Sequence, residues 1–143
     1  MSEDIFHLGI KALIRNKHGE ILLLHVDPAA VGGKEYWDIP GGRVQRGYGV
    51  EETLRREIEE ETGVRDVEIG KHLGMVLSPI RLTVENGDVG LILSIYECAI
   101  PDSATIVPND GMIEYAWLPP KEAAKCLANK YPPEFCELIA SLK

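Results

Sequence analysis

The segment Arg56-Glu57-Ile58-Glu59-Glu60-Glu61-Thr62-Gly63-Val64 closes a run of helix-forming residues that starts at Val50. The run predicts a helix over residues 50–62, and Gly63 is the expected C-terminal cap. At about 100° per residue, three of the glutamates fall in one sector of that helix. These are Glu57, Glu60 and Glu61, and their sector adjoins and overlaps the apolar stripe of Val50, Leu54 and Ile58.

Helical geometry separates two kinds of glutamate in this segment. Glu52 and Glu59 fall on the opposite side, where a solvated helix face is expected. Glu57, Glu60 and Glu61 carry like charges three and four residues apart beside apolar side chains, which is costly unless a cation neutralises them. Since carboxylate oxygens are the preferred ligands of hard divalent ions, the helix predicts a metal site on these three residues. The alternative is an ordinary glutamate-rich surface helix whose charges pair with its own arginines.

The rest of the chain alternates strand-like and helix-like segments. Strands are expected over 8–14, 21–26, 37–42, 67–77, 80–84 and 89–100, with another ending at 117–118, and helices over 121–128 and 134–142. Glycine-containing turns at 16–20 and 85–88 predict hairpins. No repeat, low-complexity tract or linker interrupts residues 1–143. They are therefore expected to form a single α/β domain with helices against a mixed sheet.

Composition and charge narrow the class of protein. The formal net charge is −8, and no apolar run reaches the roughly 18 residues of a membrane-spanning helix. An acidic chain is a poor ligand for a nucleic-acid polymer, but it can bind small anions through bridging divalent cations. The N-terminus lacks the basic start and apolar stretch of a secretory signal. We therefore expect a cytoplasmic protein with no nucleic-acid polymer and no membrane among its partners.

The glutamate helix and its surroundings resemble the Nudix box, G-x(5)-E-x(7)-R-E-U-x-E-E-x-G-U, where U is aliphatic. Gly42 matches the first position, and the block from Arg56 to Val64 matches completely. One position departs, because Tyr48 stands where the box has glutamate. In the family that acid typically braces the loop against the box arginine or supports the metal site. Its replacement is expected to leave Arg56 without one partner.

The resemblance implies a three-layer α/β/α sandwich with a mixed β-sheet and a pyrophosphohydrolase that uses Mg²⁺, with Mn²⁺ as a substitute. It implies catalytic roles for Arg56, Glu57, Glu60 and Glu61, and the three glutamates are the expected metal ligands. The backbone carbonyl of Gly41 is a further candidate ligand. The cation neutralises charge that develops on the phosphoryl oxygens, and a carboxylate activates the attacking water.

The proton acceptor in such a site is left open by the sequence. Glu57 or Glu61 is suitable, but relatives in the family often use an acid from a late loop. In this chain Asp110 and Glu114 are the candidates for that acid. The competing interpretation of both residues is an ordinary polar loop.

The resemblance also implies a small nucleotide substrate, in which a nucleoside diphosphate is linked to another moiety. Pro79 is similar to a mark of hydrolases of ADP-ribose and related sugar nucleotides, although proline is also a common turn residue. Arg43 and Arg81 are candidate phosphate contacts, and Trp37 is a candidate for stacking on a base. The competing interpretation is a solvated surface charge for each arginine and core packing for Trp37. The alternatives are a nucleoside triphosphate pyrophosphohydrolase and a weakly catalytic nucleotide-binding regulatory module. Homodimers are frequent in the family, so a homodimer is left open.

Overall fold

The strands of the protein form two sheets, in a computed structural model that describes residues 2–143. The larger sheet has the strand order β4 (Gly41–Arg43), β1 (Phe6–Ile14), β7 (Gly87–Ala99) and β5 (Glu68–Leu77), and β6 (Leu82–Val84) pairs with β7. Strands β1 and β7 are parallel and the other pairs are antiparallel, so this sheet is mixed, as predicted.

The smaller sheet is antiparallel and contains β3 (Trp37–Asp38), β2 (Ile21–Val26) and β8 (Met112–Leu118). The predicted hairpin between 8–14 and 21–26 is therefore wrong. The two strands lie in different sheets and share one isolated bridge, Arg15 to Ile21. The physical reason is that β4 and β7 occupy both edges of β1, so β2 takes other partners. The second expected hairpin is confirmed by the antiparallel pairing of β6 with β7.

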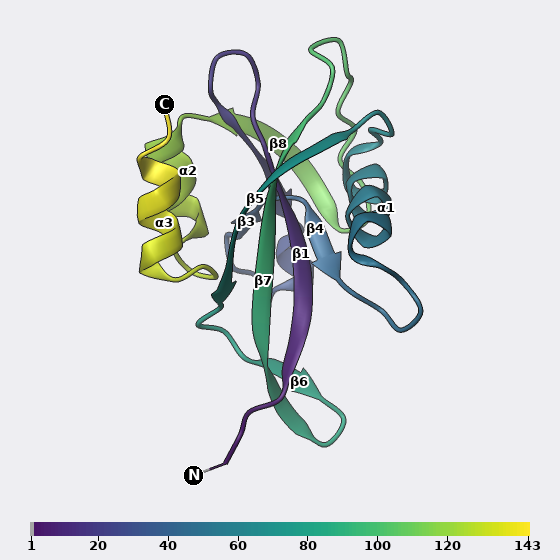
Figure 1. Ribbon diagram of the computed structural model, residues 1–143, viewed down its shortest axis with the longest axis vertical. Helices are drawn as coiled ribbons and strands as arrows, with labels where there is room; N and C mark the ends of the chain where they lie inside the picture. The colour runs from purple at the N-terminus through teal and green to yellow at the C-terminus, as the bar shows by residue number, and fades with distance from the viewer. Residues whose placement is uncertain (1) are drawn as a thin grey trace.

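The strands form the middle layer of the fold. Helices cover both faces of this layer (Figure 1), which confirms the three-layer α/β/α sandwich. On one face lies α1 (Val50–Thr62), and on the other lie α2 (Pro120–Leu127) and α3 (Pro133–Ala140). A short 3-10 helix, Pro28–Ala30, precedes β3. None of the helices within residues 2–143 is long and apolar enough to cross a membrane.

Alternation along β1 divides the core into two parts. Ile10 and Ile14 pack in one apolar cluster with Leu54 and Ile58 of α1, whereas Leu13 packs in a second cluster with α2 and α3. Successive side chains of a strand point to opposite faces, so the odd positions of β1 face the α2–α3 side. This register places a lysine, Lys11, at a core position on that side, where it is 4% exposed.

The ends of α1 agree with the sequence prediction. Gly49 precedes the helix, and its N–H donates to Oε1 of Glu52 at 3.4 Å. Gly63 ends the helix with a φ of 77°, and its N–H donates to the carbonyl oxygen of Glu59 at 2.8 Å. The helix is thus fixed at both ends, and its glutamates hold defined positions against β4 and β1.

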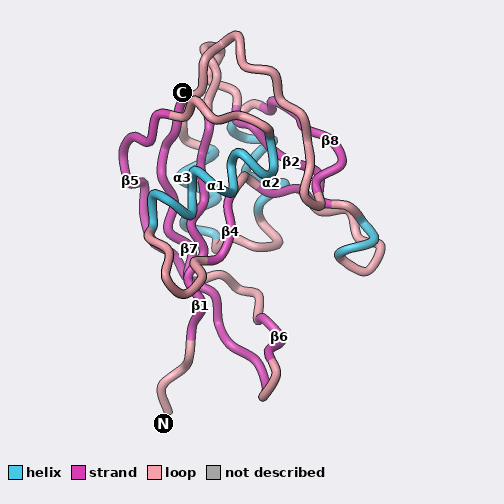
Figure 2. Tube along the Cα trace, turned by 90° about the vertical axis from the view of Figure 1, so that its right-hand side faces the viewer, coloured by secondary structure: helices cyan, strands magenta, loops and turns pink. Residues whose placement is uncertain are grey.

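The hairpin of β6 and β7 projects from the same end of the molecule as the N-terminal segment (Figures 1 and 2). Arg81 connects the two, because its guanidinium bonds Asp4 and also Asp88, with an Nη2–Oδ1 distance of 2.6 Å to Asp88. These contacts pin the start of the chain to the hairpin.

Candidate active site

Three carboxylates converge at one end of the α1 face. One oxygen from each of Glu57, Glu60 and Asp110 lies within 4.8 Å of the others. Two of them are neighbours on successive turns of α1, and Asp110 comes from the loop before β8, where its φ is 55°. The loop reaches α1 because the N–H of Asn109 donates to the carbonyl oxygen of Glu61 at 3.1 Å. We call this group the acidic trio.

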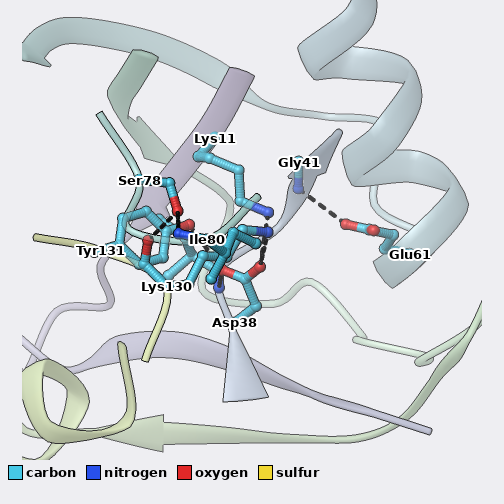
Figure 3. Close-up of polar contacts among 9 residues, drawn as sticks. Lys11, Asp38, Gly41, Glu61, Ser78, Ile80, Lys130 and Tyr131 are labelled. Carbon is cyan, nitrogen blue, oxygen red and sulfur yellow. Dashed lines mark hydrogen bonds and ion pairs between the residues drawn. The ribbon is translucent and has the colours of Figure 1, made fainter. Parts of the chain in front are cut away.

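Glu61 is not a member of the acidic trio and contacts the start of β4 instead. Its side chain is buried, and its Oε1 accepts a hydrogen bond from the N–H of Gly41 at 2.9 Å (Figure 3). The sequence grouped Glu61 with Glu57 and Glu60 as one ligand set. The structure gives Glu61 a different contact, in which it joins α1 to the strand that begins at Gly41.

Direction, rather than exposure, separates Glu59 from Glu60 on α1. Their side chains are 44% and 45% exposed, so the expected contrast between a solvated and a desolvated residue is absent. Glu59 bonds Arg65 at 2.6 Å on the outer side, whereas Glu60 points toward Glu57 and Asp110. The helical wheel therefore placed both residues correctly by direction.

The electrostatics of these carboxylates suit a divalent cation. Burial and then the neighbouring Glu60 raise the pKa of Glu57. Burial raises the pKa of Glu61 to about 7, although the Lys11 ammonium and the Gly41 N–H act against it. Crowded, partly buried carboxylates that offer only oxygen atoms match the ligand preference of Mg²⁺ and similar hard ions. The residues present therefore fit the metal that the sequence predicted.

A second polar cluster lies on the opposite side of β4 (Figure 3), and the sequence analysis did not identify it. Asp38 is its centre and is 3% exposed. Its Oδ2 accepts from Nζ of Lys130 at 2.7 Å and from Nζ of Lys11 at 3.2 Å, and its Oδ1 accepts from the hydroxyl of Tyr131 at 2.7 Å. The one available signal was Lys11 itself, because a lysine interrupts the apolar run of β1.

The charges in this cluster follow from its geometry. Burial alone acts to raise the pKa of Asp38, but the ammonium groups of Lys11 and Lys130 outweigh it and lower that pKa to about 2. Burial lowers the pKa of Lys11 against the attraction of Asp38. For Lys130 the closer Asp38 contact outweighs burial, and its pKa is raised. Asp38 is thus held as a carboxylate by two cations.

Comparisons with known proteins assign the family. The family model of the NUDIX domain matches residues 5–138. The chain belongs to the Nudix family. It is 33% identical over 116 residues to the nucleoside triphosphatase NudI of Salmonella heidelberg, a match that covers 78% of this chain and 81% of that protein. The Salmonella typhimurium protein of the same name is 34% identical over 92 residues, covering 62% and 64%.

A solved structure shows the same fold. The MutT protein of Methanosarcina mazei Go1 superposes with a TM-score of 0.71 at 26% identity, covering 97% of this chain and 94% of that chain. With the family shown, the protein is a Nudix pyrophosphohydrolase that acts on nucleoside phosphate derivatives.

The first glycine of the Nudix box, Gly42, packs directly on a member of the acidic trio. A Cβ at this position would overlap the carboxyl group of Glu57. Any side chain here would displace that carboxylate, so glycine is required for the close approach of β4 to α1. The preceding Gly41 is committed through its N–H to Glu61, and metal ligation by its carbonyl stays a prediction.

Tyr48 supplies the contact that the missing box glutamate was expected to make. The guanidinium carbon of Arg56 lies 4.6 Å from the centre of the Tyr48 ring, within the range of a cation–π interaction. Arg56 also approaches Glu57 at 3.5 Å and Glu60 at 3.8 Å. Arg56 thus lacks the carboxylate of the usual box glutamate, and an aromatic face contacts its guanidinium instead.

The two late-loop candidates have different surroundings. Asp110 joins the acidic trio, but Glu114 lies on β8 and bonds Nδ1 of His25 at 2.9 Å. The His25 ring in turn stacks on Trp37, with centroids 4.6 Å apart and planes 6° from parallel. One face of Trp37 is thus covered by a histidine, and the side chain also packs against the core on the α2–α3 side, so its contacts give no support to the predicted stacking on a base.

The remaining substrate candidates also differ in their surroundings. Arg43 is exposed and lines a cavity with Gly41 and Gly42, close to the Nudix box. Pro79 is exposed in the loop between β5 and β6. Arg81 has its guanidinium engaged by two aspartates at the end of the β6–β7 hairpin, so its contacts give no support to the predicted phosphate contact.

Proposed function

We propose that this Nudix enzyme hydrolyses a pyrophosphate linkage in nucleoside triphosphates, using Mg²⁺ held by the acidic trio. The observation that carries the proposal is the convergence of Glu57, Glu60 and Asp110 from two elements onto one point. The substrate class follows the relatives at 33% and 34% identity, which are named nucleoside triphosphatases. Of the substrates that the sequence suggested, we therefore choose nucleoside triphosphates over ADP-ribose.

When bound, Mg²⁺ or its substitute Mn²⁺ supplies positive charge that neutralises the phosphoryl oxygens as the linkage breaks. Around it, Arg56 adds a fixed cation that its contacts with Tyr48 and Glu57 orient. Glu57 and Glu61 both have a raised pKa, so each is suited to accept a proton from the attacking water. Glu61 also holds β4 against α1 and thereby positions Gly42 under Glu57.

A second candidate substrate is a nucleoside diphosphate derivative such as a sugar nucleotide or ADP-ribose. The observation that favours it is the position of Pro79, between Ser78 and Ile80 in a loop that borders a cavity beside the Nudix box. A substrate with a group beyond the second phosphate needs such additional space. The two candidates differ in their products, because only a triphosphate releases inorganic pyrophosphate with a nucleoside monophosphate.

The test is a product screen of the purified protein with Mg²⁺, followed by ³¹P NMR. We expect pyrophosphate and nucleoside monophosphate from triphosphates, and a much slower reaction with sugar nucleotides. Monophosphate with sugar phosphate as the main products would support the second candidate instead. Mg²⁺-dependent binding of nucleotides without any turnover would support the regulatory module that the sequence left as an alternative.

Three further expectations accompany this proposal. We propose a cytoplasmic location, a single domain over residues 1–143, and partners limited to small nucleotides. A homodimer remains a prediction that light scattering on the purified protein would test. None of these expectations changes the assignment of the acidic trio.

A further inference from the structure

A cavity of about 160 Å³ lies on the α2–α3 side of the larger sheet, next to the Nudix box. Its walls are aliphatic and come from β7, β6 and the loop between β5 and β6. They are formed by Ile80, Leu82, Leu91 and Leu93. Gly9 of β1 also lines the cavity, and a Cβ at this position would lie 3.0 Å from a side-chain carbon of Leu93. Aliphatic walls of this size suit a planar organic ring better than a strongly hydrated phosphate group.

The polar side chains that line this cavity, within residues 2–143, are Lys11, Arg43 and Lys130. All three only donate hydrogen bonds, since ammonium and guanidinium groups have no acceptor. The two lysines are the inner pair: Lys11 is buried, and the Lys130 side chain is 17% exposed. A ligand in this cavity therefore meets donors from these side chains and apolar carbon from the others.

Asp38, which lies behind the lysines, has no capacity left to accept from a ligand. Its Oδ2 accepts from both lysines, and its Oδ1 accepts from the Tyr131 hydroxyl at 2.7 Å and from the N–H of Ile39 at 2.8 Å. One of the three N–H groups of the Lys11 ammonium donates to Asp38, which leaves two N–H groups for a ligand. A buried ammonium group with unused donors is costly, and a ligand oxygen would satisfy it.

Gly42 lies between the cavity and the acidic trio and borders both. This glycine lines the cavity, and a Cβ on it would overlap the Glu57 carboxyl group. Arg43 follows it and also lines the cavity, where its exposed side chain suits a phosphate. A nucleotide whose phosphates lie at the acidic trio would thus direct its base toward Lys11 and Lys130.

The loop between β5 and β6, which forms one wall of the cavity, is hydrogen-bonded to the backbone of Lys130. The Ser78 hydroxyl donates to the carbonyl oxygen of Lys130 at 2.5 Å, and the N–H of Ile80 donates to the Ser78 oxygen at 3.2 Å (Figure 3). Ser78 therefore connects the loop that carries an aliphatic wall to the backbone of Lys130, whose ammonium group is held by Asp38. Such coupling gives the cavity a defined shape before any ligand enters.

We propose that this cavity binds the nucleobase, and that Lys11 and Lys130 select bases that present keto oxygens, such as guanine or uracil, over adenine. The inference rests on the proposed function, because it takes a nucleotide as the substrate. Guanine and adenine are similar in size but differ at position 6, where guanine has an oxygen that accepts and adenine an amino group that donates. An amino group pointing at two ammonium groups leaves donors facing donors. The selection also disfavours ADP-ribose among the diphosphate derivatives.

The first experiment compares kcat/KM for GTP and ATP with the purified protein and Mg²⁺. Hydrogen bonds to charged groups contribute about 1.5–3 kcal/mol, so we expect GTP to be preferred by about tenfold or more. Lys11→Met should reduce the preference to near unity. Lys71→Met, which changes an exposed lysine of β5, is the matched control and should keep it. An equal rate for both nucleotides, or an unchanged preference in Lys11→Met, would overturn the proposal.

The second experiment needs neither turnover nor a variant. The Lys11 and Lys130 ammonium resonances of the wild-type protein are followed by NMR in EDTA while GMP, AMP or inorganic pyrophosphate is added. We expect GMP to shift both resonances and AMP to shift them far less. Equal shifts with pyrophosphate would identify a phosphate site and overturn the base assignment. If no triphosphate is hydrolysed, the proposed function fails, whereas the GMP result still decides the identity of the cavity.

Discussion

The guanidinium carbon of Arg56 lies 4.6 Å from the centre of the Tyr48 ring. Glutamate is the usual residue of the Nudix box at position 48, so this contact replaces an ion pair by a cation–π interaction. The ring is 47% exposed, whereas the Arg56 side chain is half-buried and also approaches Glu57 and Glu60. Three variants at position 48 test whether the ring orients the arginine.

Tyr48→Phe should keep both stability and turnover, since the aromatic face remains. Tyr48→Ala should lower the free energy of unfolding by about 0.5–1 kcal/mol, the usual size of an exposed cation–π interaction. It should also lower kcat several-fold, because Arg56 loses its orientation beside Glu57. Urea unfolding and steady-state kinetics measure the two effects. Wild-type behaviour of Tyr48→Ala would show that the stacking has no consequence, and Tyr48→Glu shows whether the usual box residue is still accepted.

Asp110→Asn should lower kcat/KM by at least about 10- to 100-fold, since changing even an outer partner of a metal site has effects of this size. Glu114→Gln is the matched control, because Glu114 is an acid of the same segment that bonds His25 instead. It should keep near wild-type activity. Equal losses in both variants would contradict the assignment of Asp110 to the acidic trio.

Glu61 should make the metal-free protein less stable as the pH rises. Burial raises its folded-state pKa to about 7 from the ordinary 4.5. A carboxyl with a raised pKa favours the folded state when it is protonated, so its contribution is complete below about pH 4.5 and is lost as the pH rises to 7. A difference of this size corresponds to about 3 kcal/mol. Urea unfolding in EDTA should show the decline in the wild type, and Glu61→Gln should remove it. If the free energies of unfolding of the wild type and of Glu61→Gln change with pH in the same way, the raised pKa is not that of Glu61.

At acid pH, the contribution of Asp38 to stability should change with pH in the direction opposite to that of Glu61. Its pKa is lowered to about 2 by Lys11 and Lys130, so its contribution to stability is complete above about pH 4 and is lost as the pH falls toward 2. Asp38→Asn should cost about 3–5 kcal/mol, because it leaves two ammonium groups without their buried counter-charge. Asp66→Asn, at an exposed position, is the control. Equal unfolding free energies for both variants would contradict the buried cluster.

The sequence predicted α1 to the residue, because helix propensity, glycine cap and apolar stripe all lie within one local segment. Its glutamates could be sorted by direction for the same reason. Local pattern did not assign strands to sheets: β1 and β2 are both rich in buried aliphatic residues, and only long-range pairing separates them. The alternation of strand-like and helix-like segments predicted a mixed sheet, and the family resemblance implied the three layers.

The candidate site was predictable only where its residues are close in sequence. Glu57 and Glu60 are one helical turn apart, but the choice of Asp110 over Glu114 depends on how the late loop docks on α1 through Asn109. The same limit applies to the buried cluster. Asp38 and Lys130 are far apart in the chain, and their contact arises only when α2 and the following turn pack on β3. Tertiary packing therefore determines which late acid joins the site and which residues form the buried cluster, and residue type alone does not.

The central claim is that Glu57, Glu60 and Asp110 together bind a divalent cation. Titration of the protein with Mn²⁺, followed by electron paramagnetic resonance of the free ion, measures this directly. We predict that the wild type binds Mn²⁺, that Glu57→Gln and Asp110→Asn each weaken binding about tenfold or more, and that Glu114→Gln binds as the wild type does. Unchanged Mn²⁺ affinity in both Glu57→Gln and Asp110→Asn would contradict the claim.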